Sequence, residues 1–398
     1  MVCGRVSVRP RALRASVGAQ FRLKRRILYL ISSLAQGGAQ RHLLELIRFL
    51  DLGAYEVAIC ALNDKNHFGA DLPPGQPAYP LGSPVFWNPV AFLRLAAALR
   101  SFRPDILHCY MNDGNLWGRF ASRLHRPPAV LTSVHLDEMD PVHRFWERRL
   151  HPWTDRIVAH SRSIERLLVE DLDVPPSKVT VIANGVDVDR FTVVTADSRR
   201  AARRAHALDD DAFVALMPAR IAEQKNQDLV VEALATLKAK NKLPATFRLL
   251  LAGAISSRSL SRKVDHLIAR HGLGEQVKRL GAVKDMPALF AATDVVLMPS
   301  RTEASPIAAL EGLAAGVPVL ISDTSNTDEV VIPGRHGWQV KANDRAELER
   351  TLEVVLSTSQ AEREALGRAG RTHVEARFTN ARVGRDFARL YASLLSSP

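Results

Sequence analysis

From about residue 26, apolar runs of five to eight residues alternate with stretches of helical periodicity. The runs are almost continuously apolar, which predicts strands buried on both faces, and helices between such strands indicate parallel sheets. The strands predicted in the first half are 27–32, 56–62, 106–110, 130–135, 156–160 and 179–183. Those in the second half are 213–218, 247–252, 277–280, 294–299 and 317–321. The predicted helices include 39–50, 89–102, 163–172, 228–240, 262–270 and 306–315.

Two α/β units of this kind, in a chain of 398 residues, predict two doubly wound, Rossmann-like domains. Polar segments break the apolar rhythm between residues 189 and 211. We therefore predict an N-terminal domain over 25–195 and a C-terminal domain over 205–377. Ligands of such sheets bind beyond the carboxyl ends of the strands, so candidate residues are sought there.

Composition narrows the class of protein. The apolar fraction of 46% is ordinary for a globular protein. The sequence contains no run of eighteen apolar residues, so no membrane-spanning helix is predicted. The three cysteines (Cys3, Cys60 and Cys109) lie far apart, which disfavours a disulfide framework or a cysteine zinc site. This cysteine usage favours a reducing cytoplasm.

The net charge is +12, and part of it is concentrated in a basic N-terminal extension, residues 1–24. Three interpretations stay open: an extension that does not fold, an arm that contacts anionic lipid, or a transit-like leader. The basic residues are not interleaved with aromatic residues that could stack on bases, and no nucleic-acid-binding motif is present. We therefore expect no nucleic-acid partner.

The segment 294–318 is the most informative part of the chain. A predicted strand ends in a short polar loop, and Ser305 with Pro306 then opens a helix, where the serine oxygen is expected to cap a free N–H. A helix start at a strand end suits an anion. Glu303 and Glu311 flank this start, and the helix rises roughly 9 Å between Ser305 and Glu311. Two carboxylates with an anion seat between them fit a nucleotide-sugar, which has hydroxyls at both ends and phosphates in the middle.

This segment resembles the E-x7-E motif of the GT-B glycosyltransferases of the GT4 type, also called glycosyl transferases group 1. Three other segments agree with the resemblance: Arg220 and Lys225 at a spacing of five, Gly37 and Gly38 after the first predicted strand, and residues 183–187. The resemblance implies the GT-B fold, in which two Rossmann-like domains face each other across a cleft. It also implies that the final helix, within 378–398, crosses back to the first domain.

The resemblance implies a role for each matching residue. Arg220 and Lys225 would stabilise the departing diphosphate, since fixed cations at that place favour the transition state over the ground state. Glu311 would bind the ribose, and Glu303 would face the sugar ring. The predicted catalytic residues are Glu303, Arg220, Lys225 and His135, the last near the transferred sugar. The predicted nucleotide-sugar-binding residues are Gly37, Gly38, Arg220, Lys225, Gly253, Glu303, Ala304, Ser305, Pro306, Ile307 and Glu311.

No metal site and no cofactor are expected. The D-x-D pairs at 171–173 and 187–189 lie outside the strand-end context that would hold a metal-bound diphosphate. Arg220 and Lys225 would supply the positive charge instead. No residue pair is typical of a nucleophile with its base, which suits retention by front-face attack, with the leaving phosphate taking the acceptor's proton. The resemblance also implies retention.

We therefore predict a retaining, metal-independent glycosyltransferase. It would transfer a hexosyl or N-acetylhexosaminyl unit from a UDP-sugar or GDP-sugar to a glycan or lipid-linked acceptor, in polysaccharide or glycolipid biosynthesis. Basic clusters within 119–126 and 144–149 are open to two interpretations, contact with lipid phosphates at the inner face of the membrane or ordinary solvated faces. The alternatives in function are a nucleotide-sugar 2-epimerase on the same fold and a non-catalytic, basic surface-binding protein.

Overall fold

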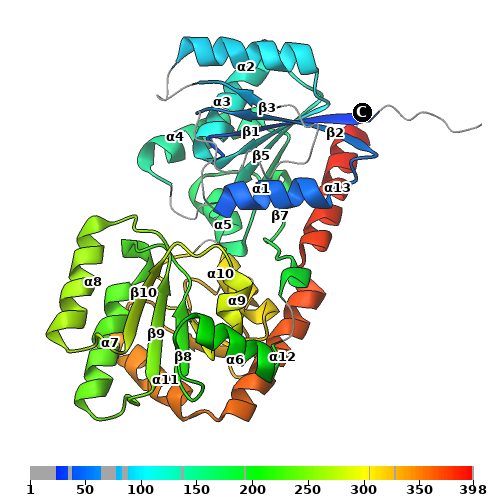
Figure 1. Ribbon diagram of the computed structural model, residues 1–398. Helices are drawn as coiled ribbons and strands as arrows, with labels where there is room; N and C mark the ends of the chain where they lie inside the picture. The colour runs from blue at the N-terminus through cyan, green and yellow to red at the C-terminus, as the bar shows by residue number, and fades with distance from the viewer. Residues whose placement is uncertain are drawn as a thin grey trace, which may run out of the picture.

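The computed structural model describes residues 24–34, 38–63, 78–82, 88–135, 139–191, 194–303, 305–326 and 329–396. It contains two parallel sheets, each with helices on both faces, stacked one above the other in Figure 1. The prediction of two α/β, Rossmann-like domains is thereby confirmed. None of the helices in these ranges is both long enough and apolar enough to cross a membrane.

Among the described residues, the N-terminal sheet has seven strands in the order β3-β2-β1-β4-β5-β6-β7. All the neighbouring pairs in it are parallel, and β1, β4 and β5 are buried almost throughout. The prediction missed β3, which has only three residues and forms an edge of the sheet. The strands are β1 (Arg25–Ile31), β2 (Tyr55–Ala61), β3 (Ala78–Pro80), β4 (Ile106–Tyr110), β5 (Ala129–Val134), β6 (Arg156–Ala159) and β7 (Val179–Val181).

Helices cover both faces of this sheet: α1 (Gly38–Phe49), α2 (Pro89–Phe102), α3 (Met111–Leu124), α4 (Pro141–Leu150) and α5 (Arg162–Arg166), which continues as a π-helical segment, Leu167–Asp171. Arg119 and Arg123, which were expected on a helical stretch, lie on α3, whose two glycines lower its helix propensity. The structure explains both glycines, because a Cβ on Gly114 would lie 2.9 Å from the Leu30 carbonyl oxygen and one on Gly118 would lie 2.1 Å from the Cys109 Sγ. Helix α3 therefore packs unusually close to β1.

The C-terminal sheet has the strand order β10-β9-β8-β11-β12-β13, again all parallel. The prediction missed β13, an edge strand with two residues not fully buried. The strands are β8 (Phe213–Met217), β9 (Phe247–Ala252), β10 (Val277–Gly281), β11 (Val295–Met298), β12 (Val319–Ser322) and β13 (Gly337–Val340). The helices are α6 (Ala196–Ala205), α7 (Gln227–Ala239), α8 (Arg258–Arg270), α9 (Met286–Ala291), α10 (Ile307–Ala314), α11 (Arg345–Ser357) and α12 (Gln360–Arg377).

The chain passes between the domains twice, and the two passages run side by side. The backbone N–H of Val186 donates to the Phe378 carbonyl (2.8 Å), and that of Asn380 donates to the Val186 carbonyl (3.0 Å). A Cβ on Gly185 would lie 2.7 Å from the Thr379 backbone, so only glycine permits this approach. Polar segments far apart in the sequence thus form a paired connection.

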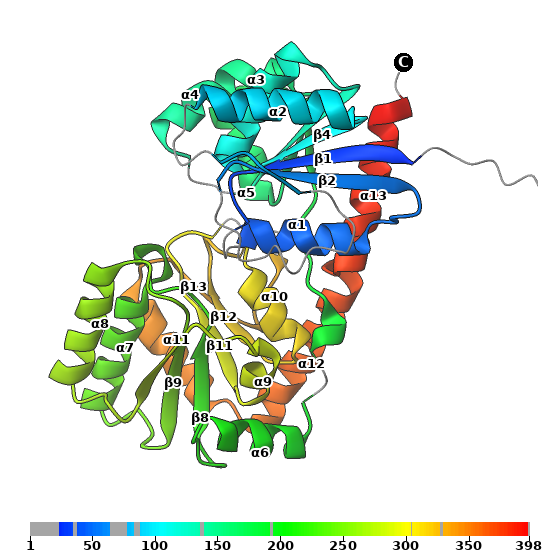
Figure 2. The same cartoon turned by 45° about the horizontal axis from the view of Figure 1, so that its top comes forward.

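After this connection, α13 (Asn380–Ser396) packs against α1 in the N-terminal domain. Figures 1 and 2 both show α13 in red beside the blue α1. The Tyr391 hydroxyl reaches the N-terminal core, where it lies 2.9 Å from both the Tyr29 hydroxyl and Nδ1 of His108. The last helix is therefore part of the first domain's core.

One member of the predicted basic clusters is not on the surface. Arg119 is 1% exposed and forms a two-pronged ion pair with Glu147, with N–O distances of 2.6 Å and 2.5 Å. Its Nε also donates to the Thr154 hydroxyl (2.7 Å). Arg119 therefore cannot contact lipid, and the interpretation of that residue as a surface cation is wrong. The pair fixes α3 to α4.

We expect Glu147→Ala to lower the free energy of unfolding by about 3–5 kcal/mol, because it leaves a buried guanidinium without its partner. Replacing both groups by apolar residues, in Arg119→Met with Glu147→Leu, should restore most of this loss. Equilibrium urea unfolding measures both changes. The control is Glu165→Ala, which removes an exposed pair with Arg162 and should cost no more than about 1 kcal/mol. Equal losses in the two single variants would contradict the assignment.

Candidate functional site

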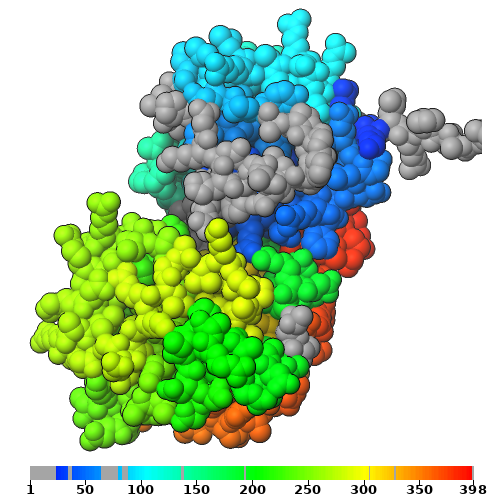
Figure 3. Space-filling model, viewed as in Figure 1, coloured from blue at the N-terminus to red at the C-terminus, as the bar shows by residue number. Residues whose placement is uncertain are grey.

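The carboxyl-end edges of the two sheets face each other, and side chains from both domains meet there. Nη1 of Arg41, on α1, lies 3.3 Å from Oε1 of Glu311, on α10. The side-chain amide of Asn184 donates to the Ser305 hydroxyl (2.8 Å). Figures 1 and 2 agree in placing the yellow α10 directly beneath the blue α1, and Figure 3 shows the two domains in the same orientation. The candidate site therefore lies between α1 and α10.

Glu311 is the buried member of this contact. It is 7% exposed, so the alternative that it lies on a solvated helix face is excluded. Burial raises the pKa of its carboxyl group, and the Arg41 guanidinium partly offsets that rise. A carboxylate in an otherwise apolar helix needs a polar partner, and without a ligand Arg41 supplies one.

Lys225 and Glu303 form a second ion pair at the adjacent strand ends. Lys225 ends a 3-10 turn (Glu223–Lys225) beyond β8, and Glu303 lies in the loop beyond β11, the strand next to β8. The side-chain amide of Gln224 donates to the Thr302 carbonyl (2.9 Å), which ties the two loops together. The predicted catalytic lysine and glutamate are therefore direct partners.

Arg220 is exposed on the same loop, and its Nη1 donates to the Ser256 hydroxyl (3.0 Å). Gly253 follows β9, and a Cβ there would lie 2.1 Å from the Ala219 carbonyl oxygen. The predicted close approach at Gly253 thus exists, but its partner in this structure is the backbone that carries Arg220. This glycine positions the arginine loop.

The start of α10 differs from the prediction. The helix begins at Ile307, Pro306 holds the cap position, and no side chain caps the helix. The Ser305 hydroxyl accepts a hydrogen bond from Asn184 instead, so the expected serine cap is wrong. In the first turn, the N–H groups of Ile307 and Ala309 donate to the Ser305 (3.0 Å) and Pro306 (2.9 Å) carbonyls, so backbone groups take the place of a side-chain cap.

One further predicted residue, Gly38, lies close to this helix start. A Cβ on Gly38, the first residue of α1, would lie 3.8 Å from the Ile307 side chain, an ordinary contact. Gly37 and Ala304, which were also predicted to bind the nucleotide-sugar, lie outside the described residues.

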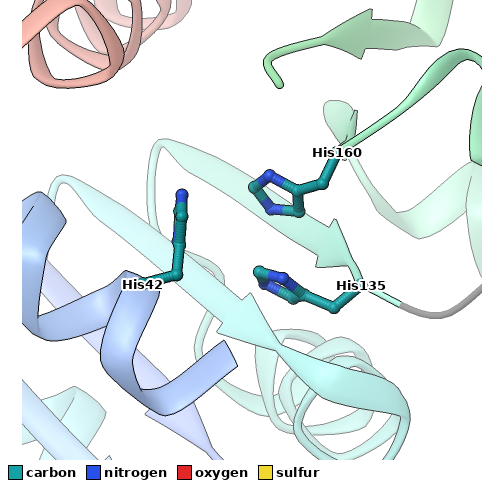
Figure 4. Close-up of side chains that lie close together, drawn as sticks. All are labelled: His42, His135 and His160. Atoms are coloured by element: carbon teal, nitrogen blue, oxygen red, sulfur yellow. The ribbon is translucent and has the colours of Figure 1, made fainter. Parts of the chain in front are cut away.

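His135 follows β5 in the N-terminal domain and lies among other histidines rather than alone. Its ring stacks on that of His160 (centroids 3.9 Å apart), and His42 of α1 meets both rings edge-on. Figure 4 shows the three rings pointing toward one another. Burial lowers the pKa of each imidazole, that of His160 to about 4.

Sequence reasoning missed Arg41, His42 and His160. His160 ends a predicted strand, and that strand-end position was an available signal. Arg41 and His42 lie inside a helix, where only the packing of α1 over the sheet brings them to the site.

The comparisons with known proteins agree with this geometry. The model "Glycosyl transferases group 1" matches residues 198–373, and "Glycosyltransferase Family 4" matches residues 36–190. A D-inositol 3-phosphate glycosyltransferase of Salinispora arenicola is 31% identical over 302 residues, which cover 71% of this chain and 67% of the relative. The UDP-Gal:alpha-D-GlcNAc-diphosphoundecaprenol alpha-1,3-galactosyltransferase of Escherichia coli is 24% identical over 262 residues, 64% of this chain and 67% of that protein.

Among solved structures, Anabaena Alr3699/HepE in complex with UDP and glucose superposes with a TM-score of 0.82 at 18% identity. The match covers 93% of this chain and 100% of that one, which confirms the predicted GT-B fold. The two family models together span both domains of the chain. The chain belongs to the glycosyl transferases group 1 (GT4) family, and it is a glycosyltransferase.

Proposed function

We propose that the protein is a retaining, metal-independent glycosyltransferase that uses a nucleotide-diphosphate sugar. The observation that carries this proposal is the Lys225–Glu303 ion pair beside the uncapped start of α10, with Glu311 buried within the same helix. A cation, a helix start and two carboxylates are the groups that would contact the diphosphate and the hydroxyls of a nucleotide-sugar.

Donor binding would exchange partners at both ion pairs. A diphosphate carries more negative charge than Glu303 and would draw the Lys225 ammonium and the Arg220 guanidinium to itself. Glu303 would then be free to face the sugar ring. At the other end, ribose hydroxyls would donate to Glu311, which Arg41 holds in the absence of donor.

The transfer step follows from this arrangement. The bond between the anomeric carbon and the diphosphate oxygen breaks, and the acceptor oxygen bonds to that carbon on the same face. The acceptor's proton passes to the departing phosphate oxygen. Lys225 and Arg220 stabilise the charge that develops on the diphosphate, and Glu303 stabilises positive charge at the anomeric carbon.

The relatives favour particular substrates. The superposed Anabaena protein binds UDP and glucose, and the Escherichia coli relative acts on UDP-Gal and a diphosphoundecaprenol-linked sugar. These names support UDP before GDP as the nucleotide and a lipid-linked or glycan acceptor, in polysaccharide or glycolipid biosynthesis.

The first experiment screens UDP-, GDP- and ADP-sugars for thermal stabilisation, because a ligand that binds only the folded state raises Tm. We expect a UDP-sugar to give the largest rise in Tm.

The second experiment supplies this UDP-sugar as donor and sugars linked to a lipid diphosphate as acceptors, with and without EDTA. We expect retention of anomeric configuration and undiminished turnover in EDTA. An epimer formed without acceptor would favour the epimerase instead, and loss of turnover in EDTA would refute metal independence.

Two variants test the site. Lys225→Ala should lower kcat/KM roughly 10- to 100-fold, the equivalent of one lost charge-assisted contact of about 1.5–3 kcal/mol. Glu311→Gln should weaken UDP binding by a similar factor. Lys284→Ala removes an exposed lysine of the same domain and serves as the control, with unchanged kinetics. Normal turnover in both site variants would leave a non-catalytic, surface-binding protein as the better explanation.

We further propose that the N-terminal domain contacts an anionic membrane that carries the acceptor. Large apolar side chains are exposed on neighbouring helices, and beside them lies a pocket lined mainly by aromatic side chains. Exposed Arg123 and Arg149 stack over the Trp153 and Phe145 rings, at 5.2 Å and 5.4 Å, and bring positive charge to this face. The exposed apolar residues are Val90, Leu93, Leu124, Val142 and Phe145, and the pocket is lined by Asn88, Pro89, Phe92, Trp117 and Phe120.

Co-sedimentation with vesicles containing anionic lipid measures this contact. We expect Leu93→Asp with Phe145→Asp to abolish most of the binding, since it places charge where apolar side chains would enter the interface. Val354→Asp changes a similarly exposed apolar residue of the C-terminal domain and should bind as the wild type does. Equal binding by all three proteins would refute the proposed face.

A further inference from the structure

The histidines at the carboxyl edge of the N-terminal sheet form a compact cluster. His42, His135 and His160 each place a ring nitrogen within 4.8 Å of the others'. They come from α1 and from the ends of the adjacent strands β5 and β6, so three separate elements fix their positions (Figure 4). His42 is 7% exposed and His160 is 1% exposed, so the cluster is shielded from water.

Several ring nitrogens of this cluster have no hydrogen-bond partner among the described residues. Nδ1 of His160 lies 3.0 Å from the Ile182 carbonyl oxygen, which can only accept, so this nitrogen carries the proton. Nε2 of His160 is therefore a bare lone pair, and it is buried without a hydrogen-bond partner. Nε2 of His135 and both nitrogens of His42 are also buried without one.

A fourth histidine nearby shows the contrast. His108 is fully buried in the same region, but its two ring nitrogens bond to the hydroxyls of Tyr391 (2.9 Å) and Ser133 (2.8 Å). The protein thus satisfies a buried imidazole where it serves only the core. Leaving several buried nitrogens unsatisfied costs about 1–3 kcal/mol each, so a ligand that takes their lone pairs would be stabilising.

We propose that His42, His135 and His160 together bind one transition-metal ion of the Zn²⁺ class. Neutral imidazole is the ligand that Zn²⁺, Cu²⁺ and Ni²⁺ accept, whereas Mg²⁺ and Ca²⁺ require oxygen ligands that this cluster lacks. Zn–N bonds of about 2.0–2.1 Å put tetrahedral ligand nitrogens roughly 3.3 Å apart. His135 and His160 stack with their ring planes 21° apart, so one of these two rings must turn about its side-chain bonds before both lone pairs point at one ion. The fourth position would be left to water or another small ligand.

The surroundings suit such a site. Burial lowers the pKa of the three imidazoles, which keeps them in the neutral form that binds metal. The His160–Ile182 hydrogen bond is the kind of backbone contact that orients a metal-bound histidine. His135 is only partly buried, which leaves an entry side.

The three histidines belong to neither the Lys225–Glu303 nor the Arg41–Glu311 ion pair, although His135 is also a predicted catalytic residue. The test below measures binding directly, so its outcome does not depend on the proposed activity.

The first measurement titrates wild-type, metal-stripped full-length protein with Co²⁺ and records the visible absorption that tetrahedral nitrogen coordination produces. We expect saturation at one equivalent per chain, bleaching when Zn²⁺ displaces Co²⁺, and a higher Tm with Zn²⁺. Absence of stoichiometric binding by the wild type overturns the proposal.

The second measurement assigns the ligands. His42→Phe and His160→Asn should each weaken Co²⁺ binding by about 100-fold or more, since two imidazoles remain. The control is His373→Gln, which breaks a pair on the other domain where the rings of His336 and His373 lie 4.4 Å apart. Circular dichroism checks that each variant is folded. Unchanged Co²⁺ affinity in a folded His42 or His160 variant, or its loss in the His373 control, contradicts the assignment.

Discussion

A carboxylate buried in an apolar helix has to be paired, and in this protein that requirement joins the two domains. Glu311 lies within α10 among side chains that pack on the C-terminal sheet, yet its partner, Arg41, belongs to the N-terminal domain. The contact depends on α1 lying over α10 and on the double connection that holds the domains side by side. A charge that would be unfavourable in one isolated domain becomes part of the interface between two.

The same principle applies at the other end of the site. Lys225 and Glu303 neutralise each other when no ligand is bound, so neither charge lies buried and alone. Both ion pairs are therefore the groups with which a charged, hydroxyl-bearing ligand would compete.

The histidine cluster at the carboxyl edge of the N-terminal sheet differs from the ion pairs, because its polar atoms are buried without opposite charges beside them. Apart from the His160–Ile182 hydrogen bond, several of its ring nitrogens have no partner among the described residues, whereas both ring nitrogens of the neighbouring His108 are hydrogen-bonded. Parallel strands deliver polar side chains to one edge, whether those side chains serve a donor, an acceptor or a metal ion. Several distinct chemistries can thus occupy one face of a domain.

The sequence by itself determined the two parallel α/β units, the order of their strands along the chain, and the placement of Lys225, Glu303 and Glu311 at strand ends or just beyond. Buried parallel strands need near-continuous apolar runs, and that pattern is local. The sequence did not reveal the edge strands β3 and β13, because a short or partly exposed edge strand lacks a continuous apolar run. Tertiary structure alone decided that Arg119 is buried, that Ser305 bonds to Asn184 instead of capping α10, and that Arg41 and His42 reach the site. Those outcomes depend on which elements lie next to one another, and no periodicity along the chain encodes a contact between side chains of different elements.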